Sequence, residues 1–290
     1  MVRMIRGLDH VVHCVRDLEA AGATYQRLGF QVGVVNRHPW GTWNRVVQIP
    51  GFFIELLSVG ESDKIVPPQP RHVSFGAYNR DWALRNGEGL SCLVLETDNA
   101  RTAAQGFRAS AVGDYEPFHF SRQGRRPDGS AVTVAFTLAF AADTGSPDVC
   151  FFVCEQHFPE NFWNPAFQVH PNGATAVRGI VLVADNPSDH HGFLGSFSGR
   201  REMHATSLGL VIRTARGEIS VMEPSVFARV YGCPAPVTAS GLRLAALRFA
   251  ASDLGLARTV VGRLGIETGR GALVVTPAHA HGAALVFEQA

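Results

Sequence analysis

The sequence predicts an α+β fold, built from four βαβββ modules that pair into two cup-shaped half-barrels. The first observation is repetition: a strand-like run, a polar helix cap and a helix recur, beginning near residues 7, 90, 177 and 242. The second observation is that each copy continues into strand-like runs, and that its last run contains a glutamate. These glutamates are Glu55, Glu155, Glu223 and Glu288.

The first module shows the pattern most clearly. Residues 8–15 read as a strand, Asp17 is a favourable helix N-cap, and Gly29 is suited to end the helix that follows. Strand alternation predicts that His10 shares one face with residues 8, 12 and 14. Glu55 lies in the middle of the apolar run at 52–57, and a carboxylate in such a run suggests chemistry.

Helix caps also mark the other modules, at Asp98, at Asp185 or Asn186, and at Ser252 and Asp253. Residues 158–176 are rich in turn signals and are expected to connect the two halves. We therefore divide the chain into residues 1–172, which contain the candidate site, and residues 173–290, which we expect to be structural or to mediate dimerisation.

Composition narrows the class of protein. The 290 residues carry a formal net charge of +1, which argues against nucleic acid or an anionic membrane as partner. Charged residues interrupt every apolar run, and the five cysteines form no CxxC pair. We expect a cytoplasmic protein with a small-molecule substrate. A homodimer would cover exposed sheet edges.

Several motifs resemble the glyoxalase-like branch of the vicinal oxygen chelate superfamily. They are DHVVHCVRDLEAAGATYQRLGF, HPWGTWN, FIELLSV, CEQHFPE and HPNGATA. The resemblance covers nearly the whole chain and implies a cup-shaped half-barrel from each pair of modules, with the site inside the cup. It is specific for the fold and does not fix the reaction, because this superfamily includes isomerases, extradiol dioxygenases, thiol transferases and metal-free binding proteins.

The resemblance also implies a metal site. His10 and Glu55 would meet Glu155 across the cup, and the fourth position falls near Cys92, where a catalytic glyoxalase has a histidine. His157 would supply a second imidazole if the strand end turns inward. Imidazole and carboxylate together suit a divalent ion such as Zn, Fe, Mn, Co or Ni.

A further set of side chains is expected to contact the substrate. His38, Trp43 and Asn44 lie at a turn between two strands of the first module. In the second module, Arg122 is suited to hold a carboxylate or enolate with two hydrogen bonds. The candidate substrate-binding residues are His38, Trp43, Asn44, His119, Arg122 and Phe136.

Three functions stay open at this point. The leading one is a metal-dependent lyase or isomerase, in which Glu155 or Glu55 acts as general base on a proton next to a carbonyl. The alternative is a metal-free binding or resistance protein that uses the aromatic walls of the cup. An extradiol-type dioxygenase is a further alternative, although it needs two histidines and one glutamate, and only His10 is secure.

Overall fold

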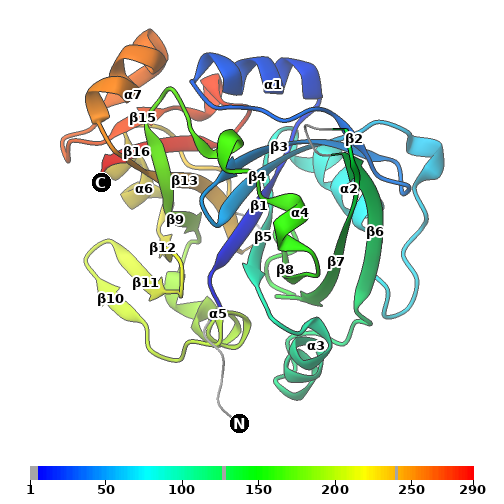
Figure 1. The fold of residues 1–290 in the computed structure, drawn as a ribbon. Coiled ribbons are helices and arrows are strands. Elements are labelled where there is room, and N and C mark those ends of the chain that lie inside the picture. Colours follow the sequence, from blue (N-terminus) through cyan, green and yellow to red (C-terminus); the bar gives the residue numbers. More distant parts are fainter. Residues whose placement is uncertain (1–5, 126–128, 239–240) are drawn as a thin grey trace.

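The computed structural model describes residues 6–125, 129–238 and 241–290. Its strands form two eight-stranded sheets, one in each half of the chain (Figure 1). The first has the order β2-β3-β4-β1-β5-β8-β7-β6 and the second β10-β11-β12-β9-β13-β16-β15-β14. The strands of the first sheet are β1 (Leu8–Cys14), β2 (Asn36–Arg37), β3 (Thr42–Ile49), β4 (Phe52–Val59), β5 (Gly89–Glu96), β6 (Phe118–Arg125), β7 (Ala131–Ala141) and β8 (Cys150–Gln156). The strands of the second are β9 (Ala174–Val183), β10 (His204–Thr206), β11 (Gly209–Arg213), β12 (Glu218–Met222), β13 (Arg243–Ala251), β14 (Gly265–Glu267), β15 (Leu273–Val275) and β16 (Ala284–Gln289).

Helices connect and cover these strands. The α-helices are α1 (Leu18–Arg27), α2 (Phe75–Asn86), α3 (Ala100–Ala109), α4 (Pro159–Phe162), α5 (His191–Ser198), α6 (Pro224–Tyr231) and α7 (Leu254–Val261). Short 3-10 turns are η1 (Ser62–Lys64), η2 (Pro165–Gln168), η3 (Pro187–His190), η4 (Gly262–Leu264) and η5 (Pro277–His279). Within the described residues, no helix is long and apolar enough to cross a membrane.

Strand pairing confirms the predicted fold. In each module the first strand runs parallel to the last, as in β1 with β4 and β5 with β8. The first strands of two successive modules pair antiparallel and join the modules into one sheet, as in β1 with β5 and β9 with β13. The protein is therefore an α+β chain of four modules in two cup-shaped halves.

Local sequence explains where the helices begin. The Asp17 carboxylate accepts hydrogen bonds from the backbone N–H groups of Glu19 and Ala20 and so starts α1. Asn99 caps α3 in the same way, one residue later than the predicted Asp98. Gly29 follows α1 with φ of 79°, a conformation that favours glycine.

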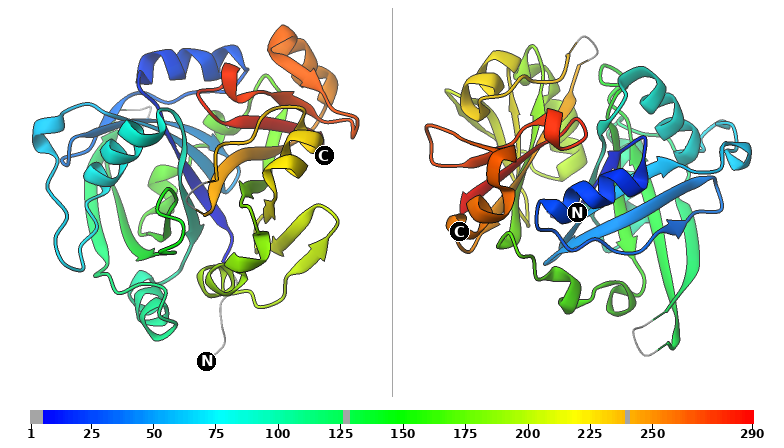
Figure 2. Two further views of the ribbon diagram at one scale, coloured as in Figure 1. Left: turned by 180° about the vertical axis from the view of Figure 1, so that it is seen from behind. Right: turned by 90° about the horizontal axis from the view of Figure 1, so that it is seen from above.

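The two sheets pack with their convex faces toward each other, and one apolar core fills the space between them. This core joins residues of both halves, such as Val11 and Phe151 with Ile180 and Phe249. Helices α1, α3, α5 and α7 contribute to the same core, and Figure 2 shows them around the two sheets. The concave faces hold two separate apolar clusters, which α2 and α6 partly fill. We call these concave spaces the first cup and the second cup.

A β-bulge in β1 corrects the predicted alternation. Leu8 pairs with Leu95 and His10 with Val94, so Asp9 is an extra residue in the ladder. Leu8 consequently faces the shared core, whereas Val12 faces the first cup. The expectation that residue 8 shares the face of His10 was wrong.

Candidate functional site

The first cup contains a cavity of ≈ 60 Å³. This space suffices for about four to six water-sized atoms. Aromatic rings make up most of its wall, and a few polar side chains interrupt them. The lining residues are His10, His38, Trp40, Asn44, Val46, Phe53, Glu55, Phe75, Phe118, Phe120, Arg122, Phe136, Leu138, Phe152, Cys154 and Phe162.

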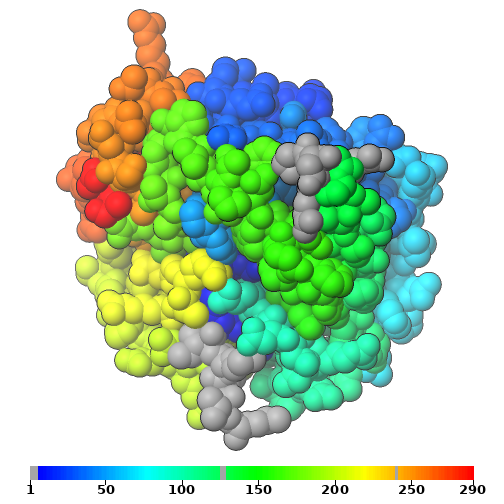
Figure 3. Space-filling model, viewed as in Figure 1, coloured from blue at the N-terminus to red at the C-terminus, as the bar shows by residue number. Residues whose placement is uncertain are grey.

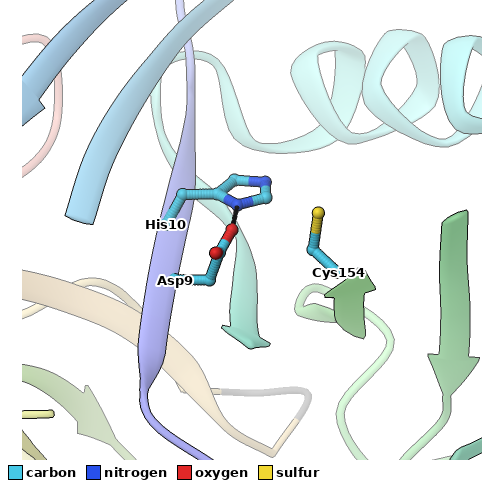
Figure 4. Close-up of side chains that lie close together, drawn as sticks. All are labelled: Asp9, His10 and Cys154. Carbon is cyan, nitrogen blue, oxygen red and sulfur yellow. Dashed lines mark hydrogen bonds and ion pairs between the residues drawn. The ribbon is translucent and has the colours of Figure 1, made fainter. Parts of the chain in front are cut away.

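One polar group in this wall is centred on His10. Its Nδ1 lies 2.5 Å from Asp9 Oδ2, and Gln156 Nε2 donates to Asp9 Oδ1 at 2.9 Å. One potential ligand atom each of Asp9, His10 and Cys154 lie within 4.8 Å of one another, and all three residues are buried. Figure 4 shows the second ring nitrogen of His10 pointing away from Asp9, on the side where Cys154 lies.

The bulge in β1 makes this group possible. Because the ladder gains one residue at Asp9, two consecutive side chains of β1 reach the same place. The His10 ring also stacks on Phe53 at 4.2 Å between centroids, which fixes its plane. Burial, together with the neighbouring carboxylates of Asp9 and Glu55, raises the pKa of the Cys154 thiol.

A second polar group surrounds Glu55 on β4. Asn44 Nδ2 donates to Glu55 Oε1 at 2.6 Å, and His38 Nε2 lies 3.9 Å from the same oxygen. His38 Nδ1 in turn lies 2.8 Å from the hydroxyl oxygen of Thr42. Burial lowers the pKa of His38, with the Glu55 charge opposing this and Arg122 adding to it. His38 is therefore neutral at pH 7.

Arg122 is the cationic side chain in the wall of this cavity. It lies on β6 and is half-buried, and burial lowers the pKa of its guanidinium while the Glu55 charge opposes that shift. Within the described residues, no hydrogen bond or ion pair is formed by this guanidinium.

Six of the residues singled out from the sequence line the cavity. They are His10, Glu55, His38, Asn44, Arg122 and Phe136. The structure gives their positions in the cavity wall, and their roles in binding or catalysis stay predictions.

Three others point away from the first cup. Glu155 Oε2 accepts from the backbone N–H of Ala100 at the start of α3, at 2.9 Å. His157 Nε2 and His119 Nδ1 both lie within hydrogen-bond distance of the Thr137 hydroxyl, at 2.7 and 2.9 Å. The expectation that Glu155 and His157 meet His10 and Glu55 inside the cup was therefore wrong, as was the expectation that His119 faces the substrate.

Trp43 also lies outside the cavity wall. Its indole N–H donates to Glu61 at 3.2 Å, and the Arg37 guanidinium lies 4.5 Å from its ring centroid. In β3 the side chains alternate, so Asn44 faces the cup and Trp43 faces the opposite side. Trp40, three residues earlier, is the tryptophan that lines the cavity.

Strand register explains why Glu155 was misplaced. The first strands of the four modules can be aligned by counting back five positions from the helix cap that follows each of them. This places four residues at the same position: Val12, Val94, Val181 and Arg248. Their partners in the last strands are Glu55, Phe152, Ser220 and Val286. The four glutamates thus do not occupy one repeated position.

Each of the other glutamates is displaced from the position of Glu55. Glu155 lies three residues after Phe152 and so faces the other side of the sheet, because an odd shift reverses the face. Glu288 lies two residues after Val286, which places it on the second cup. Glu223 follows the end of β12 and precedes α6.

Asp9 and Cys154 were not among the residues predicted to form the site. Cys154 could have been predicted from the sequence. The cap at Asn99 identifies the cup-facing position of β5, the strand partner of that position is Phe152, and Cys154 lies two residues further on the same strand face. No comparable signal marks Asp9, since its position depends on the bulge.

The residues present do fit a metal ion, although not with the expected ligands. Asp9, His10 and Cys154 supply oxygen, nitrogen and sulfur, which suits zinc or another borderline transition metal. Gln156 Oε1 is buried without a hydrogen-bond partner in the described structure, next to Asp9. A buried acceptor without a donor is costly, and a cation would satisfy it.

Fold and site together define a vicinal oxygen chelate protein whose first cup contains a mixed polar cluster. A family model described as "Glyoxalase-like domain" matches residues 8–196, and the chain belongs to this glyoxalase-like family. A search of curated proteins found no match.

Solved structures of low sequence identity share this fold. A hypothetical protein from Staphylococcus aureus is 12% identical, with a TM-score of 0.64 over 99% of this chain and 100% of the other. A mutant of 4-hydroxymandelate synthase from Streptomyces coelicolor is 12% identical, with a TM-score of 0.60 over 98% and 92%. A fusion protein of a xylose isomerase-like TIM barrel and a 4-hydroxyphenylpyruvate dioxygenase is 12% identical, with a TM-score of 0.53 over 99% and 50%. At this identity the likeness shows the fold alone.

Proposed function

We propose that the first cup is the active site of a divalent-metal-dependent enzyme of the lyase or isomerase type, acting on a small oxygenated molecule. The observation that carries this proposal is the buried group of Asp9, His10 and Cys154, whose ligand atoms lie within 4.8 Å of one another, with His10 and Cys154 in the wall of the cavity. A divalent ion held by these residues would polarise an oxygen of the substrate. Zinc, iron or cobalt suits this donor set better than a hard ion such as magnesium.

The chain's own residues provide the rest of the chemistry. Asp9 binds His10 Nδ1 and so fixes the ring orientation, as carboxylates commonly do for metal-binding histidines. Glu55 is suited to accept a proton from the substrate, because its Oε1 is held by Asn44 while its side chain faces the cavity. Phenylalanine side chains around the cavity exclude water from the reacting groups.

The test is metal binding by the purified protein, prepared without chelator and without a metal-affinity tag. Cobalt or zinc is titrated calorimetrically, and thiolate-to-cobalt charge-transfer absorption reports sulfur coordination. We expect His10→Ala and Cys154→Ser to lose affinity by about 100-fold or more, above the typical loss for outer-shell residues. The matched control is Cys92→Ala, a buried cysteine of the neighbouring strand that lies outside this ligand group.

Two results would contradict the proposal. One is wild-type affinity in both His10→Ala and Cys154→Ser. The other is a loss in Cys92→Ala that Cys154→Ser does not show, which would return the metal to the position that the family resemblance suggested.

The second candidate is a metal-free binding protein of the same fold. The specific observation in its favour is the aromatic wall, in which Trp40, Phe118 and Phe120 contact one another edge to face or tilted. Burial of a ligand against such rings supplies binding energy without a metal. This candidate predicts that ligand affinity survives Cys154→Ser and falls in Phe136→Ala.

A further inference from the structure

Two donors in the wall of the first cup have no hydrogen-bond acceptor among the residues that the structure describes. The guanidinium of Arg122 forms no hydrogen bond or ion pair within the described part of the chain. The indole N–H of Trp40 is buried and likewise without a partner there. Both side chains line the same cavity. A buried donor left unpaired costs free energy, so the Trp40 N–H indicates an acceptor that arrives with a ligand, and the half-buried Arg122 guanidinium in the same wall is available to that ligand.

Arg122 lies at the junction between two spaces. It lines the inner cavity of ≈ 60 Å³ and also an outer groove of ≈ 730 Å³. Among the described residues, only Val46 and Phe162 share this double position with it. The groove runs along the connecting segment that contains α4 and η2, which covers this face of the molecule (Figure 3). A ligand that reaches the cavity through this groove passes the guanidinium.

Glu55 does not take the place of this missing acceptor. Its carboxylate acts on Arg122 electrostatically, but the two side chains form no ion pair. Glu55 Oε1 is instead engaged by Asn44 at 2.6 Å. The five N–H donors of the guanidinium are therefore open to a planar anion, which they bind with two parallel hydrogen bonds.

We propose that the first cup selects organic acids, and that the substrate carboxylate pairs with Arg122 at the junction of cavity and groove. This inference rests on the proposed function in one respect, namely that the cup is the ligand site. A part of the acid with about four to six non-hydrogen atoms enters the inner cavity, toward His10 and Glu55. Larger apolar substituents extend into the groove, along Trp163 and Phe167.

The experiment compares an acid with its neutral isostere. Phenylacetate and phenylacetamide, and benzoate and benzamide, are titrated into the metal-free protein and followed by calorimetry and saturation-transfer NMR. The wild type is expected to bind each acid roughly tenfold or more tightly than its amide, because the charge-assisted pair adds binding energy. Arg122→Gln abolishes this preference, and Arg122→Lys retains part of it, since lysine keeps the charge but not the planar fork.

The matched control is Arg101→Gln, an exposed arginine on α3 outside both spaces. It should keep the full preference. Equal affinity of the wild type for acid and amide, absence of binding by either acid, or a preference that survives Arg122→Gln would each overturn the proposal. If Arg122 only balances the charge of Glu55, its replacement changes thermal stability and leaves the preference intact.

Failure here differs from failure of the proposed function. Acid selectivity is measured without metal, so it can persist in a protein that binds no metal ion. Conversely, metal binding that depends on His10 and Cys154 can persist in a cup without acid selectivity.

Discussion

The two halves share one topology, yet their cups are filled in opposite ways. In the second cup Arg248 donates to both Glu218 and Glu288, and Arg178 lies 3.7 Å from Glu288. Most of the charge in that larger space of ≈ 740 Å³ is thus neutralised within the chain. In the first cup the walls are aromatic, and within the described residues the Trp40 N–H and the Arg122 guanidinium have no hydrogen-bond acceptor. The ion pairs of the second cup are suited to stabilise the fold, whereas the unpaired donors of the first cup are suited to bind a ligand.

Equivalent positions show how the two cups differ. The place of His10 in β1 is taken by Gly179 in β9, and the place of Glu55 by Ser220. Glu288 in the second cup corresponds to Cys154 in the first. Each lies two residues after the residue that pairs with the aligned first-strand position, which is Val286 for Glu288 and Phe152 for Cys154. The second cup therefore lacks the imidazole, and its carboxylate is bound to arginine.

The largest expected effect is on the second cup. Arg248→Met leaves Glu218 and Glu288 without their shared cation. Because this network is only partly buried, we expect a cost of about 3 kcal/mol of unfolding free energy, the lower end of the range for buried pairs. Denaturant unfolding measures this change. Ligand and metal binding by the first cup should be unaffected at temperatures where the variant is folded.

The matched change in the first cup is Glu55→Gln, which keeps an oxygen that can accept from Asn44. We expect its stability to change by less than about 1 kcal/mol. If Glu55→Gln destabilises as strongly as Arg248→Met, the contrast between a structural cup and a functional cup is wrong.

A second expected effect concerns the joint between the halves. His13 of β1 is fully buried, with Nδ1 2.8 Å from the Tyr25 hydroxyl and Nε2 2.7 Å from the carbonyl oxygen of His281 in the second half. Burial lowers the pKa of His13 from 6.5 to about 4. His13 is therefore protonated below about pH 6.5 in the unfolded chain, but only below about pH 4 in the folded chain. This contribution to stability is complete above pH 6.5 and is lost as the pH falls toward 4.

The expected loss from His13 is about 1.4 kcal/mol per pH unit, or roughly 3 kcal/mol over the whole interval. The difference in unfolding free energy between wild type and His13→Gln, measured from pH 7.5 to 4, isolates it from other histidines. A glutamine can still donate to His281 and accept from Tyr25 but does not titrate, so the two proteins should have similar stability at pH 7.5, and the wild type should become the less stable one by roughly 3 kcal/mol as the pH falls to 4. A difference that does not vary with pH would contradict the account.

Particular residues show how far the sequence determines the fold. The caps at Asp17 and Asp253 and the spacing from cap to strand predict the modules, because these are local signals. His10 and Glu55 were placed in the first cup by strand alternation and by the resemblance, and Asn44 by its position at a turn between two strands. Both sources work where a strand is regular.

Where the ladder is irregular, the same reasoning fails. The bulge at Asp9 brings a second acid into the site, and only tertiary pairing with β5 reveals it. Glu155 stood one residue from a cup-facing position, and one residue reverses the face. The sequence also predicts a hairpin turn at Asp128-Gly129, and this turn lies partly outside the described residues, since residues 126–128 are not covered.

The most direct measurement of the central claim is an anomalous difference map from crystals of the protein soaked with zinc. The account predicts one strong peak in the first cup, bounded by Asp9, His10 and Cys154, with zinc–sulfur distance near about 2.3 Å. It predicts no peak in the second cup, where Arg248 already binds both carboxylates. A first cup without zinc, or zinc bound instead beside His119 and His157 on the outer face, would contradict it.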